Sequence, residues 1–162
     1  LLARRLCESG CGFITVSSPG WDMHGAYEFA ITDGMPVLGP AVDKAVSAFI
    51  EDIEYRGLTE KVLLVITGEF GRTPKINAKG GRDHWGNLCP LVFVGGGLKM
   101  GQVIGESDKK GAEPITNPIT SNDLLGTIMH SLFDLGQVRT LANIPRDVQD
   151  VVGSGNPISE LI

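Results

Sequence analysis

Two segments of the chain space their apolar residues in the manner of amphipathic helices. Between residues 37 and 55 the apolar positions recur every three or four residues, as one buried helical stripe requires. The same spacing returns between 120 and 136, with Thr120 or Ser121 as the N-cap and Gly136 near the end. The pattern therefore predicts two helices that each bury one face.

Three apolar runs predict strands, at residues 12–17, 62–67 and 91–94. The run at 62–67 lacks polar alternation, which is typical of a parallel strand covered on both faces. Residues 102–104 favour a further short strand, and for 137–162 we expect little regular structure beyond a turn of helix.

The order strand, helix, strand, loop, strand, helix is typical of an α/β layered domain with flanking helices. Ligand sites in such sheets lie beyond the carboxyl ends of the strands, and two polar loops, 21–24 and 69–72, directly follow predicted strands. The first residues read as the last turns of a helix that ends at Gly10, without an initiator Met. We therefore expect residues 1–162 to be one part of a single domain in a longer protein.

Composition narrows the class of protein. The chain has 162 residues, 42% of them hydrophobic and 20% charged, as in an ordinary soluble globular domain. Its net charge of -5 and the absence of Lys/Arg runs argue against nucleic acid as the main partner. No apolar run approaches the roughly 18 residues that a membrane span needs.

Several residues of types that often bind ligands or react are interpreted here as structural. Cys7, Cys11 and Cys89 form no Cys-x-x-Cys pair, so we expect small buried hydrophobes rather than a disulfide framework or a thiolate zinc site. His130 lies off the apolar stripe of its helix, which predicts an exposed or helix-packing histidine. The glycines at 95–97 lack a phosphate-binding fingerprint and should let one backbone pass close to another.

Asp22 and His24 are the first candidates for chemistry. They stand two residues apart between Pro19 and Gly25, and in an extended backbone residues i and i+2 point to the same side. A carboxylate and an imidazole are ligands that suit zinc and similar divalent ions. The alternative is a loop with an Asx-turn and a surface histidine.

A second candidate group lies in the loop between residues 68 and 85. Asp83 and His84 are adjacent, so one could face the same ion as the first pair while the other orients a ligand or serves a second ion. Glu69 adds a carboxylate, with an ion pair to Arg72 or Arg82 as its alternative role. Histidines beside carboxylates in two strand-end loops favour a metal site.

Three basic residues in this loop, Arg72, Lys75 and Arg82, could clamp an anionic substrate. Arginine does so well because its planar guanidinium matches phosphate or sulfate oxygens. A solvated basic rim that neutralises nearby carboxylates explains the same residues.

Four motifs in order resemble a bacterial sulfatase-like family of unknown function within the alkaline phosphatase superfamily. The motifs stand here at Pro19-Gly20-Trp21-Asp22-Met23-His24-Gly25, at residues 68–74, at Gly81-Arg82-Asp83-His84-Trp85, and at 94–97 with 101–105. The segment 120–136 resembles the closing helix of that family, so the similarity covers nearly the whole chain.

The resemblance implies an alkaline-phosphatase-like layered sheet with a metal-dependent hydrolase site at the strand ends. By it, His84 matches the final ligand histidine of the superfamily, and Asp22 and His24 match an earlier Asp-and-His ligand pair with shorter spacing. Glu69 and Phe70 stand where relatives carry Asp-His, so Glu69 could bind metal and Phe70 could not.

These expectations combine into one functional hypothesis. The chain would be the C-terminal portion of a metal-dependent hydrolase of sulfate or phosphate esters, acting on a small-molecule or polysaccharide anionic ester. Asp22, His24, Glu69, Asp83 and His84 would bind a divalent metal, most readily zinc, and Arg72 would hold the anionic group.

The remaining expectations concern the nucleophile, the location of the protein and an alternative function. The resemblance places the nucleophile outside this chain and implies a periplasmic or exported protein. The alternative hypothesis is a non-catalytic metal-binding or structural module that retains the fold.

Overall fold

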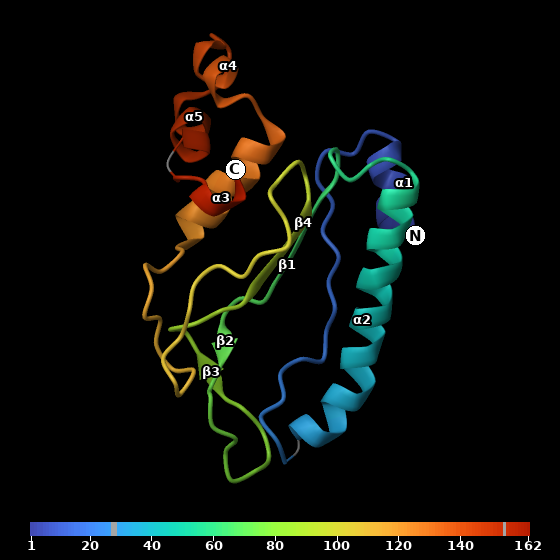
Figure 1. Cartoon of the computed structure of the whole chain (residues 1–162), viewed down its shortest axis with the longest axis vertical. Coiled ribbons are helices and arrows are strands. Elements are labelled where there is room, and N and C mark those ends of the chain that lie inside the picture. Colours follow the sequence, from blue (N-terminus) through green and yellow to red (C-terminus); the bar gives the residue numbers. More distant parts are fainter. Residues whose placement is uncertain (27–28, 154) are drawn as a thin grey trace. The chain divides into compact units, whose positions relative to one another are not determined.

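The protein is a mixed α/β chain in which helices predominate, as a computed structural model covering residues 1–26, 29–153 and 155–162 describes it (Figure 1). The chain divides into two compact units. The first comprises 1–58, 67–91 and 109–113, and the second comprises 59–66, 92–108 and 114–162.

The long helix of the first unit is α2, Ile31–Tyr55, which begins well before the predicted residue 37. The prediction was wrong there because Pro36 reads as a helix stop, whereas α2 contains both Pro36 and Pro40. Its first turn is held from outside, since the Ile31 backbone N–H donates to the Gly80 carbonyl at 3.0 Å.

A short helix, α1 (Leu2–Glu8), is tied to α2 by ion pairs. Arg4 is only 7% exposed, and its Nε lies 2.7 Å from Oδ2 of Asp52 while its guanidinium also pairs with Glu8. Arg56 extends the network, 2.8 Å from Asp52 and 3.2 Å from Glu8. Hydrogen bonds from Arg56 and Arg4 lower the pKa of Asp52. The predicted helix before Gly10 is confirmed.

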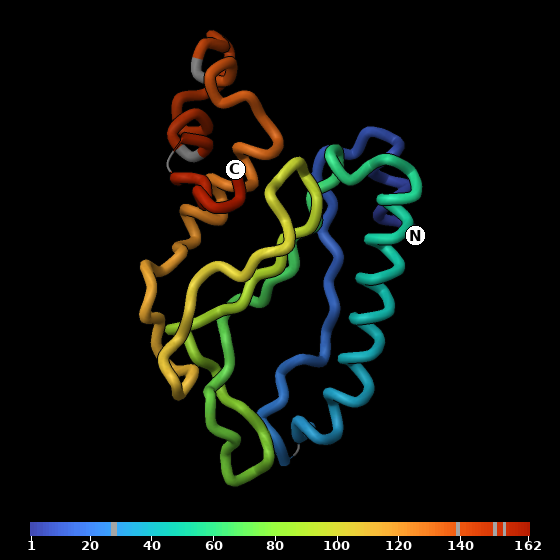
Figure 2. The backbone as a smooth tube through the Cα atoms, in the orientation of Figure 1, coloured from blue at the N-terminus to red at the C-terminus, as the bar shows by residue number. Residues whose placement is uncertain are grey.

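Residues 12–17 are not the buried strand that their composition predicts. Within the described residues this segment pairs with no strand and follows an irregular path (Figure 2). Phe13 and Val16 are 77% and 76% exposed. β-branched and aromatic residues favour strands only where a neighbouring strand accepts their backbone hydrogen bonds and side chains.

The first unit also holds a small antiparallel ribbon that the sequence analysis did not identify. Strand β2 (Gly71–Arg72) pairs with β3 (His84–Trp85), with Arg72 opposite His84. Two-residue strands are too short to produce a recognisable alternation. The ribbon nevertheless places an arginine and a histidine side by side.

Strands β1 (Leu63–Thr67) and β4 (Leu91–Gly95) form a two-stranded sheet at the positions predicted for them. Most of their residues belong to the second unit. Its apolar core contains Leu98, Ile158 and Leu161, against which Leu63, Phe93 and Ile104 pack.

The glycines after β4 allow the close backbone approach that was expected. A Cβ on Gly95 would lie 2.5 Å from the Val62 carbonyl oxygen, and one on Gly96 would lie 2.7 Å from Ser131 Oγ. Both have positive φ, at 77° and 65°, and the Gly96 carbonyl accepts a 2.7 Å hydrogen bond from Ser131. Side chains larger than hydrogen do not fit here.

Helix α3 (Ser121–Leu132) begins where predicted. Thr120 is its N-cap and forms a reciprocal capping box with Asp123, whose pKa these hydrogen bonds lower. The helix ends at Leu132, before the predicted Gly136, and His130 near its end is exposed.

The C-terminal segment is more regular than predicted, with helices α4 (Leu135–Thr140) and α5 (Arg146–Gly153) and a 3-10 turn (Ser159–Leu161). The prediction was wrong because prolines and glycines in a short segment favour loops, whereas here the Pro145 carbonyl accepts the first hydrogen bonds of α5. Residues 102–104 form no strand in the described chain.

The three cysteines are more exposed than predicted. Cys11 and Cys89 are exposed and Cys7 is partly exposed, so their predicted burial was wrong. Among the described residues no helix has the length and apolar character that a transmembrane span requires.

Candidate metal centre

The loop that carries Asp22 and His24 is anchored by the residue between them. Met23 is 5% exposed, and its side chain lies over Gly34 of α2. The backbone turns here, with the Met23 N–H donating to the Trp21 carbonyl at 3.0 Å, and Asp22 and His24 approach each other while Met23 packs on α2. Their nearest atoms, Asp22 Oδ1 and His24 Nε2, are 2.9 Å apart.

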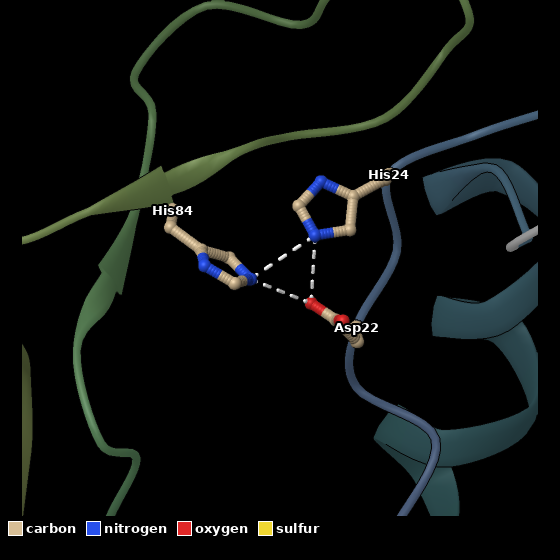
Figure 3. Close-up of side chains that lie close together, drawn as sticks. All are labelled: Asp22, His24 and His84. Atoms are coloured by element: carbon tan, nitrogen blue, oxygen red, sulfur yellow. Dashed lines mark hydrogen bonds and ion pairs between the residues drawn. The ribbon is translucent and has the colours of Figure 1, made fainter.

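His84 completes a compact triangle with this pair (Figure 3). Its Nε2 lies 3.1 Å from Asp22 Oδ1 and 3.1 Å from His24 Nε2. The three side chains come from two segments about 60 residues apart and point toward one another, so that one oxygen and two nitrogens converge on a common space.

The two segments are joined by close backbone packing. Gly25 and Gly80 form an isolated β-bridge, and the Arg82 N–H donates to the Met23 carbonyl at 2.9 Å. A Cβ on Gly81 would lie 2.0 Å from the carbonyl carbon of His24. The glycines are therefore required for the loops to approach closely enough to form the triangle.

Arg72 supplies the positive charge beside the triangle. Its NH1 lies 2.6 Å from Asp22 Oδ1 and 3.4 Å from His24 Nε2. The hydrogen bonds from Arg72 and His84 lower the pKa of Asp22 to about 2, so this carboxylate is ionised at neutral pH. The loops at 21–24 and 69–72 thus contact each other, although no described strand precedes the first of them.

His84 is held on its other side by an aromatic ring. The ring centroids of Phe70 and His84 are 4.2 Å apart, with a tilt of 42° between the planes. The His84 side chain is 51% exposed, so this packing restrains the imidazole without burying it. Solvent, and hence a ligand, can reach the triangle.

Asp83 does not belong to the triangle; it contacts the edge of the His24 ring that faces away from the triangle. Its Oδ1 lies 2.9 Å from His24 Nδ1, the ring nitrogen remote from the triangle. The hydrogen bonds of His24 and Asn77 lower the pKa of Asp83. Adjacent residues of a strand diverge, and the structure places His84 in the cluster and Asp83 outside it.

Asn77 is a residue that the sequence analysis missed. Its Nδ2 donates to the His24 carbonyl at 3.1 Å and to the two Asp83 oxygens at 3.2 and 3.3 Å. An asparagine ahead of two glycines signals a local turn, and the Asn77 Oδ1 does accept from the Lys79 and Gly81 N–H groups. Its contact with His24, far away in sequence, left no local signal.

The other predicted site residues lie elsewhere. Glu69 is exposed and is not part of the described cluster of ligand atoms. Arg82 uses its NH1 to donate to the Thr73 and Pro74 carbonyls, at 2.7 and 2.8 Å, which is a structural role. Lys75 is exposed.

A shallow open hollow of about 520 Å³ lies next to the triangle. It is lined by polar and charged residues of both loops, namely Asp22, His24, Asn77, Lys79 and Asp83, together with Ala78. Its lining includes Asp83 and Asn77 but neither His84 nor Arg72, so the hollow borders the triangle only at Asp22 and His24.

Comparison with known protein families identifies the family to which the chain belongs. The family model described as protein of unknown function (DUF1501) matches residues 1–162. The chain belongs to the DUF1501 family. Searches of curated proteins and of solved structures gave no match.

In this DUF1501 chain the chemistry of the site is inferred from its geometry. The donor set of one carboxylate oxygen and two imidazole nitrogens fits a divalent transition metal. Ligand atoms around a tetrahedral zinc lie roughly 3.3 Å apart, because Zn–N and Zn–O bonds are about 2.0–2.1 Å long. The three separations of 2.9, 3.1 and 3.1 Å need to widen by only a few tenths of an ångström. The residues therefore fit such an ion.

Proposed function

We propose that this chain carries the metal centre of a metal-dependent hydrolase that acts on sulfate or phosphate esters. The observation that supports it is the convergence of Asp22 Oδ1, His24 Nε2 and His84 Nε2 at separations of 2.9–3.1 Å. The carboxylate oxygen and the two imidazole nitrogens can all act as ligands of one cation once the nitrogens that face it are unprotonated.

Zinc is the ion that we propose for the centre. Two histidines and one carboxylate are the donor set of many catalytic zinc sites, which keep a further position open for substrate. A zinc ion bound here would polarise an ester oxygen and offset the negative charge that develops on it. The half-exposed His84 side chain leaves the centre accessible to such an ester.

Arg72 has the second role in this proposal. Its guanidinium lies within 3.4 Å of His24 Nε2, so an anionic group bound at the triangle would come into its reach. The planar guanidinium can donate two parallel hydrogen bonds to a sulfate or phosphate. We assign no nucleophile to the described residues. The nearby Thr73 hydroxyl already donates to the Lys75 carbonyl and accepts from the Asp83 N–H.

The metal part of the proposal is tested by elemental analysis of protein purified without chelator. We expect one divalent ion per chain, lost in His84→Ala and in Asp22→Ala. His130→Ala is the matched control, because His130 is exposed near the end of α3, in the other unit. Protein that contains no divalent metal and takes up none during zinc dialysis contradicts the proposal.

The hydrolase part is tested on the metal-loaded protein with aryl sulfates, phosphate monoesters and phosphate diesters. We expect turnover of at least one class, abolished by His84→Ala and weakened by Arg72→Ala through a higher KM. Circular dichroism of both variants checks that the fold is intact.

A second function, a non-catalytic module that binds one metal, is favoured by Phe70. This phenyl ring packs on His84 at 4.2 Å and offers no ligand atom on that side of the triangle. A two-metal site needs ligands on both sides of a shared substrate. Stoichiometric zinc without turnover on any ester of the panel would support this module over the hydrolase.

A further inference from the structure

The contacts behind His24 are as specific as those in the triangle itself. The Asp83 carboxylate is ionised at neutral pH and can only accept hydrogen bonds. Two carboxylate oxygens lie 2.9 Å from the His24 ring, Asp83 Oδ1 from Nδ1 and Asp22 Oδ1 from Nε2. Because Asp22 Oδ1 already pairs with the Arg72 guanidinium at 2.6 Å, Asp83 competes more strongly for the proton of a neutral ring, which places that proton on Nδ1. The Nε2 lone pair then points toward Asp22 and His84.

Asn77 holds both partners of this hydrogen bond. One Nδ2 hydrogen is directed to the His24 carbonyl, at 3.1 Å, and the other to the Asp83 oxygens, at 3.2 and 3.3 Å. The amide cannot be reversed, because its Oδ1 accepts from the Lys79 and Gly81 N–H groups at 2.9 and 3.0 Å. Every polar atom of the Asn77 side chain is therefore in use.

We infer that Asp83 and Asn77 are positioning residues that fix the tautomer of His24, so that Nε2 is presented to the metal as a lone pair. This inference rests on the proposed metal centre. Asp83 would touch the ion only through His24, and carboxylates in this position commonly orient ligand histidines and make them more basic. Asn77 in turn sets the direction of the Asp83 carboxylate.

The alternative tautomer explains why the positioning would matter. Without Asp83, the His24 proton gains more from lying on Nε2, where Asp22 Oδ1 is 2.9 Å away and accepts it. A zinc ion would then have to displace that proton before it could bind. Removing such partners typically lowers metal affinity about 10–100-fold.

The tautomer can be read directly in metal-free protein by long-range ¹H–¹⁵N correlation spectra of the histidine rings at neutral pH. We expect His24 to carry its proton on Nδ1 in the unaltered protein and on Nε2 in Asp83→Ala. Asp33→Asn is the matched control, an exposed aspartate in the first turn of α2 whose replacement should leave the His24 signals unchanged. An unchanged His24 tautomer in Asp83→Ala overturns the inference.

Zinc affinity, measured by competition with a chromophoric chelator, provides the second readout. We expect Asp83→Ala and Asn77→Ala to bind zinc about 10–100-fold more weakly and His24→Ala to lose it altogether. If Asp83→Ala fails to fold, Asp83→Leu replaces it in both measurements, because the leucine side chain has a similar shape and accepts no hydrogen bond. Equal zinc affinity in the variants and the unaltered protein contradicts the inference.

The two proposals fail in different ways. If the unaltered protein binds no zinc, the metal centre is wrong, and the NMR result still decides whether Asp83 fixes the tautomer. If it binds zinc and the Asp83 variants bind equally well, the metal centre stands and the positioning role is wrong.

Discussion

The side chain of Met23 occupies the space above Gly34, where a Cβ would come within 2.7 Å of both Met23 Sδ and Cε. Gly34 is buried in α2, although glycine is a poor residue for a helix interior. This contact links the long helix to the loop of Asp22 and His24, because Met23 stands between these two residues in the chain.

Gly34→Ala and Gly39→Ala should therefore have different effects although they change the same helix. A Cβ on Gly39 would meet only Met35 Cε, at an ordinary 3.7 Å. We expect Gly39→Ala to raise the free energy of unfolding by about 0.5–1 kcal/mol through helix propensity. Gly34→Ala should not raise the free energy of unfolding in this way and should weaken zinc binding, because Met23 has to move. Urea unfolding and a zinc titration measure both effects, and equal behaviour of the two variants contradicts the account.

Gly81→Ala is expected to break the packing between the two loops of the site. Its Cβ would lie 2.0 Å from the His24 carbonyl carbon and 2.5 Å from the Gly25 nitrogen, and backbone atoms cannot yield as a side chain can. Overpacking of this kind typically costs about 1–3 kcal/mol, and zinc affinity should fall with it. The control is Gly86→Ala, where no atom lies within 4 Å of the new Cβ and neither quantity should change.

Thr127 provides a test of the second unit alone. It is 0% exposed, and its hydroxyl donates to the Asp123 carbonyl at 2.7 Å while accepting from the Ile158 N–H at 2.9 Å. Thr127→Val leaves that N–H without its acceptor, at an expected cost of about 1–3 kcal/mol. Thr140→Val on α4 removes an exposed hydroxyl that only donates to the Gln137 carbonyl, and should change the unfolding midpoint little.

The elements that could be predicted from sequence are those specified by their own residues. Helix α3 has both an apolar stripe and the Thr120 cap, and strand β1 is an apolar run between polar residues. Residues 12–17 have similar strand-forming side chains but no described strand partner, and no local pattern can report whether a partner is present. The first turns of α2 were not predicted because Pro36 is typical of a helix boundary. Contacts outside the helix, such as the hydrogen bond from the Ile31 N–H to the Gly80 carbonyl, hold this part of α2 in place.

The candidate site could be predicted as a set of residues more readily than as a set of roles. Asp22, His24 and His84 were identified from residue type and loop position, and the structure brings them together. The division between His84 in the cluster and Asp83 behind His24 depends on the direction of β3. Asn77 depends on a contact across 53 residues, for which a single sequence contains no signal.

Arg72→Ala should lower the stability of the metal-free protein at neutral pH but not in strong acid. Arg72 and His84 lower the folded-state pKa of Asp22 to about 2, below its unfolded value near 3.9. A depressed carboxyl pKa contributes stability above the unfolded pKa that is lost as pH falls through the folded one. The stability difference between the unaltered protein and Arg72→Ala should thus be full above about pH 4 and vanish towards pH 2. Denaturation midpoints across this range measure it, with the exposed Arg5→Ala as control. Added salt should shrink the difference because the pair is partly exposed, and a difference that grows as the pH falls would show that Arg72 does not act through Asp22.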